Sequence, residues 1–105
     1  MSTATCQVFE AISDPTRREL LDLLAQREYS VNELVGRFEV SQPAVSHHLR
    51  ILREAGLVKK RQLGRQRLYR LQARPLREVY DWVAHYERFW TEKLGALGEH
   101  LRRNP

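Results

Sequence analysis

Polar side chains with the chemistry to recognise nucleic-acid bases recur within one short segment near the middle of the chain. Gln42, Ser46, His47 and Arg50 share the side of a possible helix that lies opposite an apolar stripe. Glutamine can form two hydrogen bonds to adenine and arginine two to guanine, while serine can bond a base or a phosphate. We therefore predict that these four residues read base edges in the major groove. An ordinary solvated helix face is the alternative for this segment considered alone.

Positive charge is concentrated in the same part of the chain. Residues 41–74 hold nine Lys or Arg and one acid, Glu54, whereas residues 1–40 carry a net charge of −3 and residues 75–105 a net charge of zero. Such segregation favours DNA binding, because Lys and Arg side chains that neutralise phosphates release counterions. We expect the following side chains to contact the sugar–phosphate backbone or to lie on the hairpin beside it: Ser41, Lys59, Lys60, Arg61, Arg65 and Arg67. We expect them to position the protein without reading sequence.

Two capped helices joined by a tight turn must position these residues. Ser30 and Glu33 form a capping box for a short helix, and residues 38–40 provide the turn. Ser41 then caps a second helix, which ends at Gly56 because glycine accepts a positive φ. Its apolar stripe consists of Val45, Leu49 and Leu52. The pattern predicts a helix-turn-helix unit over about residues 30–55.

A basic hairpin follows this unit and a long helix ends the chain. Strands over residues 57–62 and 66–71 flank a turn around Gly64, so that a wing covers about residues 57–71. Helices over 4–12 and about 14–27 precede the unit, and one long helix covers about residues 75–101. The expected fold is mainly α with a small β-hairpin wing, in the order α-α-α-α-β-β-α. It forms a single winged helix-turn-helix domain over residues 1–105.

Three stretches of the chain resemble the ArsR/SmtB family of winged-helix repressors. Residues 11–18 look like the family's entry to its second helix, 41–58 like its recognition helix running into the wing, and 64–71 like the second wing strand. The resemblance covers about residues 8–74. It implies a homodimer that binds a palindromic double-stranded DNA operator and blocks transcription, with the first and last helices forming the dimer interface.

The spacing of apolar residues in the last helix supports such an interface. Leu76, Val83, Trp90 and Leu97 recur every seven residues, which lets two helices stay in contact along their length. Packing of this face on the chain's own core is the alternative for part of it. The residues expected at the dimer interface are Val8, Phe9, Ile12, Leu76, Val79, Val83, Trp90, Leu94 and Leu97.

Two metal sites common in the resembled family are incomplete in this sequence. Ser30 and Asn32 stand where a Cys-x-Cys pair begins the third helix, and both are poor ligands for soft metals. Asp81 is followed by Trp82 and Val83, which breaks an Asp-x-His pair. We therefore expect no metal and no cofactor. A metal-responsive repressor remains an alternative, the effector is unknown, and a redox role for the single Cys6 stays open.

Composition argues against other classes of protein. The chain has no nucleophile elbow, glycine-rich phosphate loop or paired-carboxylate motif, so we do not expect an enzyme. It has no long apolar run and no signal-peptide pattern, so we expect a cytoplasmic protein without a membrane partner. A winged-helix module that binds another protein is a further alternative. The lysines disfavour it, because the centres of protein interfaces are depleted in Lys.

Overall fold

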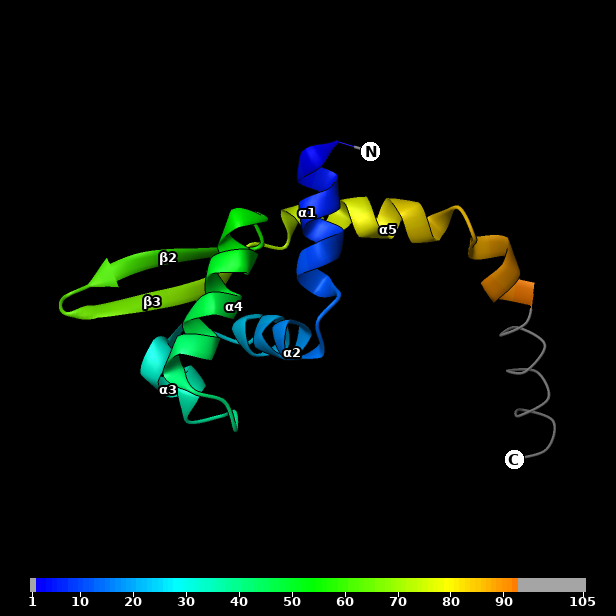
Figure 1. Ribbon diagram of the computed structural model, residues 1–105. Helices are drawn as coiled ribbons and strands as arrows, with labels where there is room; N and C mark the ends of the chain where they lie inside the picture. Colours follow the sequence, from blue (N-terminus) through cyan, green and yellow to red (C-terminus); the bar gives the residue numbers. More distant parts are fainter. Residues whose placement is uncertain (1, 93–105) are drawn as a thin grey trace, which may run out of the picture.

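The computed structural model describes residues 2–92 and has the element order of a winged helix (Figure 1). The elements are α1 (Thr3–Ile12), α2 (Pro15–Leu24), β1 (Tyr29–Ser30), α3 (Val31–Val35), α4 (Gln42–Glu54), β2 (Val58–Leu63), β3 (Gln66–Leu71), the 3₁₀ helix η1 (Arg74–Leu76) and α5 (Arg77–Ala84). The predicted fold class is therefore confirmed. The second helix ends at Leu24, earlier than the expected end near residue 27.

The core lies where α2, α3 and α4 meet the base of the hairpin. Leu20, Leu34, Leu49, Leu52 and Leu57 are completely buried there. Burying one such side chain stabilises a fold by about 1.5–3 kcal/mol. Because Leu49 and Leu52 are among these residues, one side of α4 is anchored in the core and its other side is left to solvent.

Local capping fixes where the helices begin. Ser30 Oγ accepts from the Glu33 amide at 3.2 Å, and the Ser30 amide donates to Glu33 Oε1 at 3.1 Å, which is the expected capping box. Ser41 Oγ accepts from the Ala44 amide at 3.3 Å and so caps α4. These bonds satisfy amides that have no partner inside the helix. They set the start of both helices of the helix-turn-helix unit.

The hairpin belongs to a three-stranded antiparallel sheet with the order β1-β3-β2. Strand β1, which the sequence did not predict, pairs Tyr29 with Tyr69 and Ser30 with Leu68. Two residues are too few to show an alternating pattern. The register pairs Leu63 with Gln66, so the turn has two residues, Gly64 and Arg65, rather than the expected three. Gly64 takes a φ of +62° there, which glycine adopts without a steric penalty.

The prediction of one continuous helix over residues 75–101 is wrong. Helix α5 ends at Ala84, residues 85–86 form a turn, and residues 87–92 are helical again. His85 Nδ1 donates at 2.9 Å to Asp81 O, which is the carbonyl that the His85 amide would use in an α-helix. That amide donates to Trp82 O instead, at 3.2 Å. The remainder of the expected helix, from residue 93, lies outside the described residues.

Candidate nucleic-acid interface

Helix α4 presents all four expected base-reading residues to solvent. Gln42, Ser46, His47 and Arg50 are exposed, while the stripe formed by Val45, Leu49 and Leu52 is fully buried. Arg50 Nη2 lies 3.2 Å from His47 Nδ1, one helical turn away. A helix anchored in this way can enter a groove without losing its packing.

The register of the hairpin separates its basic residues onto two faces. Lys60 pairs with the buried Tyr69, and Gln62 pairs with Arg67, so Lys60 and Arg67 share the face of Tyr69. Lys59 and Arg61 alternate with Lys60 and therefore lie on the opposite face. The sequence did not distinguish these two sets.

Lys60 and Arg67 meet a further cation from α4. The pKa of Lys60 lies below its ordinary value, chiefly because of the positive charge of Arg53, with smaller contributions from partial removal from water and from Arg67. Arg53 of α4 and Arg67 of β3 thus both repel the charge of Lys60 in the free protein. A phosphate placed among them would relieve that repulsion. The sequence analysis missed Arg53; its spacing of three residues from Arg50 was the available signal.

Arg61 has a carboxylate partner, unlike Lys60. Its Nε and Nη2 donate to the two carboxylate oxygens of Glu28, both at 2.8 Å. This hydrogen bonding lowers the pKa of Glu28, with a smaller contribution from Arg70, and raises the pKa of Arg61. The expectation that Arg61 contacts a phosphate therefore meets a competing carboxylate, which comes from a residue far away in the sequence.

Two hollows run along α4. One of about 660 Å³ lies between α3, the start of α4 and the hairpin, and the other of about 470 Å³ lies between the end of α4 and β2. Gln42, Ser46, Arg65 and Arg67 help to line the first; Arg50, Arg53, Lys59 and Lys60 help to line the second. Most of the predicted base-reading and backbone residues therefore line one of these two hollows, whereas Ser41, His47 and Arg61 line neither.

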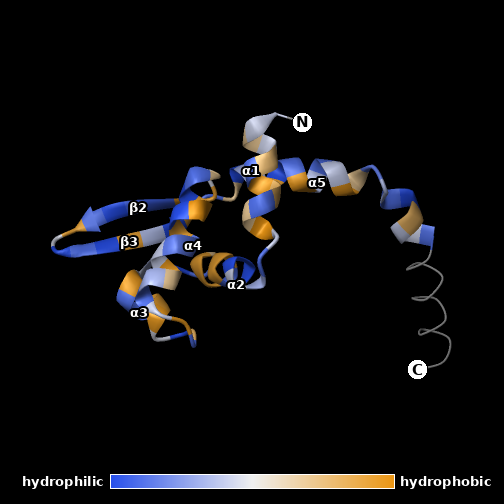
Figure 2. Ribbon diagram, in the orientation of Figure 1, coloured by the Kyte–Doolittle hydropathy of each residue, from blue (hydrophilic) through white to orange (hydrophobic). Residues whose placement is uncertain are grey.

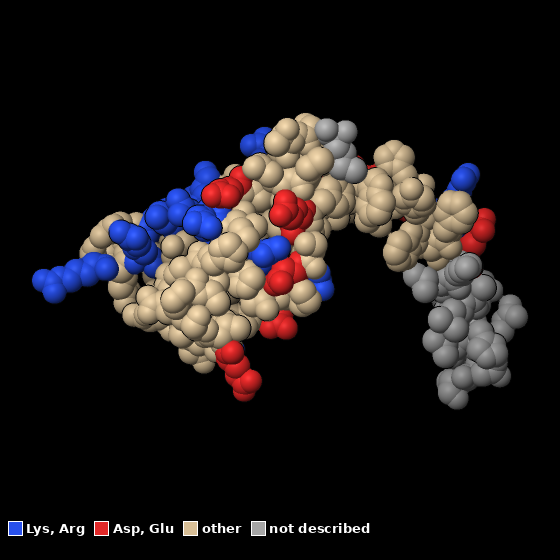
Figure 3. Space-filling view, in the orientation of Figure 1, with Lys and Arg blue, Asp and Glu red and all other residues tan. Residues whose placement is uncertain are grey.

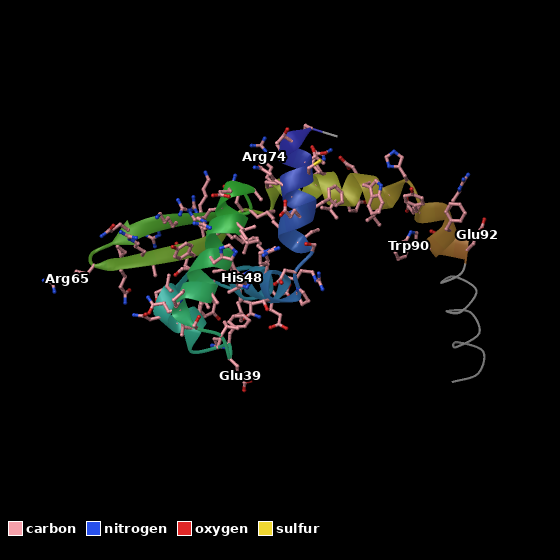
Figure 4. All side chains as sticks on the ribbon, in the orientation of Figure 1. Glu39, His48, Arg65, Arg74, Trp90 and Glu92 are labelled. Carbon is pink, nitrogen blue, oxygen red and sulfur yellow. The ribbon has the colours of Figure 1, made fainter. Side chains whose placement is uncertain are left out.

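The distribution of charge over the molecule follows the surface of α4 and the hairpin. Lys and Arg side chains gather over α4 and the hairpin, and most of the carboxylates visible in the same view lie over the rest of the body (Figure 3). Both hairpin strands are mostly hydrophilic (Figure 2). Arg65 extends from the hairpin tip (Figure 4). Ser41, at the other end of the surface, is exposed and caps α4.

A second surface, on α5 and residues 87–92, is aromatic. Trp82, Tyr86, Phe89 and Trp90 are each about half exposed, at 49%, 46%, 51% and 53%. With Val83 they line a hollow of about 340 Å³. Trp90 lies far from the body of the domain (Figure 4). Large apolar side chains gathered in this way are typical of an interaction surface.

The residues expected at the dimer interface divide into three groups. Val8 is only 3% exposed and belongs to the core, and Ile12, Leu76 and Val79 pack against that core. Phe9 meets the edge of Trp82 with ring centroids 5.7 Å apart, and so joins α1 to the aromatic surface, to which Val83 and Trp90 also belong. Leu94 and Leu97 lie outside the described residues.

One of the metal-site positions of the resembled family, Ser30, has another role in this chain. Ser30 is nearly buried and its hydroxyl caps α3. Within residues 2–92, no three His, Cys, Asp or Glu side chains come together as a metal site would require. Cys6 is exposed. None of the helices described between residues 2 and 92 combines the length and apolar character needed to cross a membrane.

Known proteins are similar to this chain in sequence and in fold. The family described as "Bacterial regulatory protein, arsR family" matches residues 14–60. The transcriptional repressor SdpR of Bacillus subtilis is 37% identical over 75% of this chain and 88% of its own length. A transcriptional repressor SmtB homolog of Synechocystis is 41% identical over 76% of this chain and 61% of its own length. The solved structure of an ArsR-like transcriptional regulator from Rhodococcus superposes with a TM-score of 0.70 at 31% identity, covering 91% of each chain.

Proposed function

Because this chain belongs to the ArsR family of bacterial regulatory proteins, we propose that it is a dimeric transcriptional repressor that binds a palindromic operator in duplex DNA. The observation that carries the proposal is the convergence of Arg53 and Lys60 on one hollow beside Arg50, on the exposed side of α4. Repelling cations next to hydrogen-bonding side chains suit a polyanion with readable edges. A solvated helix face gives no reason for that convergence.

Helix α4 lies in the major groove in this proposal. Gln42, Ser46, His47 and Arg50 contact base edges, and Arg50 in the bidentate mode is selective for guanine. Ser41, at the N-terminus of the helix, holds a phosphate, since the first amides of a helix favour anions. These contacts supply the sequence preference.

The hairpin and the end of α4 hold the sugar–phosphate backbone. Lys60 and Arg67 bind phosphates on the face of the hairpin shared with Tyr69, together with Arg53 of α4. Lys59, on the opposite face of the strand, adds a contact from the edge of the hollow that it shares with Arg50. Arg65, at the tip, reaches the backbone or an adjacent minor groove. Arg61 contributes less than its neighbours, because the Glu28 carboxylate already neutralises it. These contacts fix the register of α4 on the duplex without reading sequence.

Two copies pair through α1 and through the aromatic surface of α5 and residues 87–92. Phe9, Val83 and Trp90 take part, and Trp82 takes a central place beside Phe9. A two-fold axis there presents two α4 helices about 34 Å apart, one turn of DNA, and this requires a palindromic site. Occupying that site blocks transcription in the manner of a repressor. In this proposal the protein acts without a metal or cofactor and is not an enzyme.

Selection of bound genomic fragments tests the proposal. The purified protein is mixed with sheared DNA from the host, bound fragments are sequenced, and the enriched site is titrated in a gel shift at low and physiological salt. We expect an inverted-repeat sequence bound in the nanomolar range, with affinity that falls steeply as salt rises. A double variant, Lys60→Gln with Arg67→Gln, serves as a control that should lose affinity for every duplex. Absence of any shift at low salt would contradict the proposal.

A further inference from the structure

One arginine outside the proposed DNA-facing surface lies on α2 and contacts both α1 and α4. Arg17, in the first turn of α2, uses all of its guanidinium nitrogens: Nε donates to Ala11 O at 2.6 Å, Nη2 donates to Glu10 O at 3.1 Å, and Nη1 lies 3.2 Å from His48 Nδ1. The first two contacts are with carbonyls at the end of α1. The third is with a side chain of α4. A single rigid group therefore joins α1, α2 and α4.

His48 faces the interior of the molecule, next to a residue that faces DNA. His47 is exposed and approaches Arg50, whereas His48 is half-buried and lies beside α2 (Figure 4). Since a guanidinium only donates, His48 Nδ1 must accept, and its proton is then on Nε2. Two adjacent histidines thus hold different positions: one on the surface, one as an acceptor for Arg17.

We propose that Arg17 is a positioning residue for DNA recognition, which sets the rotation of α4 relative to α1 through its hydrogen bond to His48. The inference rests on the proposed function. The planar guanidinium makes three bonds in one plane, so α4 cannot turn about its axis without breaking the bond to His48. Such a turn would swing Gln42, Ser46 and Arg50 away from their base edges. The contact therefore acts on specificity without touching DNA.

The same contact affects both halves of the proposed dimer. Helix α1 carries Phe9, which packs on Trp82 of the aromatic surface, so α1 is fixed to the pairing surface. The angle between α1 and α4 then decides the distance between the two α4 helices across the two-fold axis. Operators with one spacing are bound well only if that angle is held constant.

Arg18 provides a matched control on the same turn of α2. Its Nη1 donates to Ile12 O at 2.8 Å and to Ser13 O at 3.2 Å, so it also satisfies carbonyls at the end of α1 and just after it. Its hydrogen bonds stay at that end of α1, whereas those of Arg17 continue to α4. Loss of Arg18 removes capping alone, and loss of Arg17 removes capping together with the link to α4.

The experiment compares Arg17→Met, Arg18→Met, His48→Leu and His48→Gln in the full-length protein. For each variant, the Kd is measured for a fragment selected from the genome and for an unrelated duplex of equal length, together with the Tm. We expect Arg17→Met and His48→Leu to lower the ratio of specific to non-specific affinity by about tenfold, the size of effect that one lost hydrogen bond to a charged group produces. Arg18→Met should keep the wild-type ratio despite a similar loss of Tm. His48→Gln keeps an acceptor for Arg17 and should retain most of the ratio.

Each other outcome has a defined meaning. A folded Arg17→Met variant with the wild-type ratio overturns the inference, and so does an equal loss of the ratio in Arg17→Met and Arg18→Met, because capping would then explain both. Should Arg17→Met fail to fold, His48→Leu decides, since it leaves the bonds to α1 in place; a wild-type ratio in that variant overturns the inference. If the wild-type protein does not discriminate between the two duplexes, the proposed function fails instead.

Discussion

The surface of α4 and the hairpin differs from the aromatic surface of α5 and residues 87–92 in the kind of side chain that it exposes to solvent. On the first, polar and charged side chains face water while the apolar residues beneath them are fully buried. On the second, Trp82, Tyr86, Phe89 and Trp90 are about half exposed. Under the proposed function, a single chain already holds its reading surface, whereas its pairing surface is complete only when a second copy covers it.

The largest expected effect is on dimerisation and comes from variants that disrupt only the aromatic pairing surface. Trp82→Glu or Trp90→Glu places an unpaired carboxylate in the proposed interface, which costs several kcal/mol, and should raise the Kd of the dimer by at least about 100-fold. Leu63→Glu is the matched control, because Leu63 is equally exposed, at 53%, but lies on the hairpin. Sedimentation velocity over a range of concentrations measures the dimer. Unchanged dimers in both tryptophan variants would contradict a pairing role for this surface.

A smaller effect separates the two faces of the hairpin. Lys60→Gln should reduce the slope of log affinity against log salt by about 0.9, the contribution of one phosphate contact. Arg61→Gln should change the slope much less, because Glu28 already pairs with Arg61. Fluorescence anisotropy with one duplex at several salt concentrations gives both slopes. Equal slopes for the two variants would show that the faces are equivalent, and that the ion pair opens on DNA.

The smallest effect concerns the ion pair itself. Hydrogen bonding from Arg61 lowers the pKa of Glu28, so the carboxylate stabilises the folded state at and above its ordinary pKa, and this contribution disappears as the pH falls through the lowered value. We expect Glu28→Gln to have a slightly lower Tm than wild type at neutral pH and the same Tm in acid. Thermal denaturation over a pH series tests this. A difference that persists in acid would assign the effect to something other than the charge.

Features set by neighbours in the sequence could be predicted, and features set by distant residues could not. The capping box of Ser30 and Glu33 and the buried stripe of α4 depend on residues within one or two turns, so the helix-turn-helix unit is confirmed. Strand β1 exists only because β3 lies beside it. The pairing of Arg61 with Glu28 and of Arg17 with His48 joins residues more than thirty positions apart, and nothing in the local pattern indicates either.

The end of the predicted last helix shows a different limit. A seven-residue apolar repeat predicts contact along one face, but it does not show that α5 ends at Ala84, where the His85 side chain bonds the carbonyl of Asp81. One residue of that repeat, Leu76, also packs against the chain's own core, as does the nearby Val79. The same apolar pattern is compatible with internal packing and with pairing, and the choice between them depends on the fold around it.

The most direct test of the central claim, that α4 reads bases while the hairpin holds the backbone, compares Arg50→Ala with Lys60→Gln. Both variants are titrated at one salt concentration against the selected fragment and against an unrelated duplex of equal length. Arg50→Ala should weaken binding to the selected fragment by about 10- to 100-fold and affect the unrelated duplex far less, whereas Lys60→Gln should weaken both alike. If Arg50→Ala weakens the two duplexes equally, or weakens neither, α4 does not read sequence and the account is wrong.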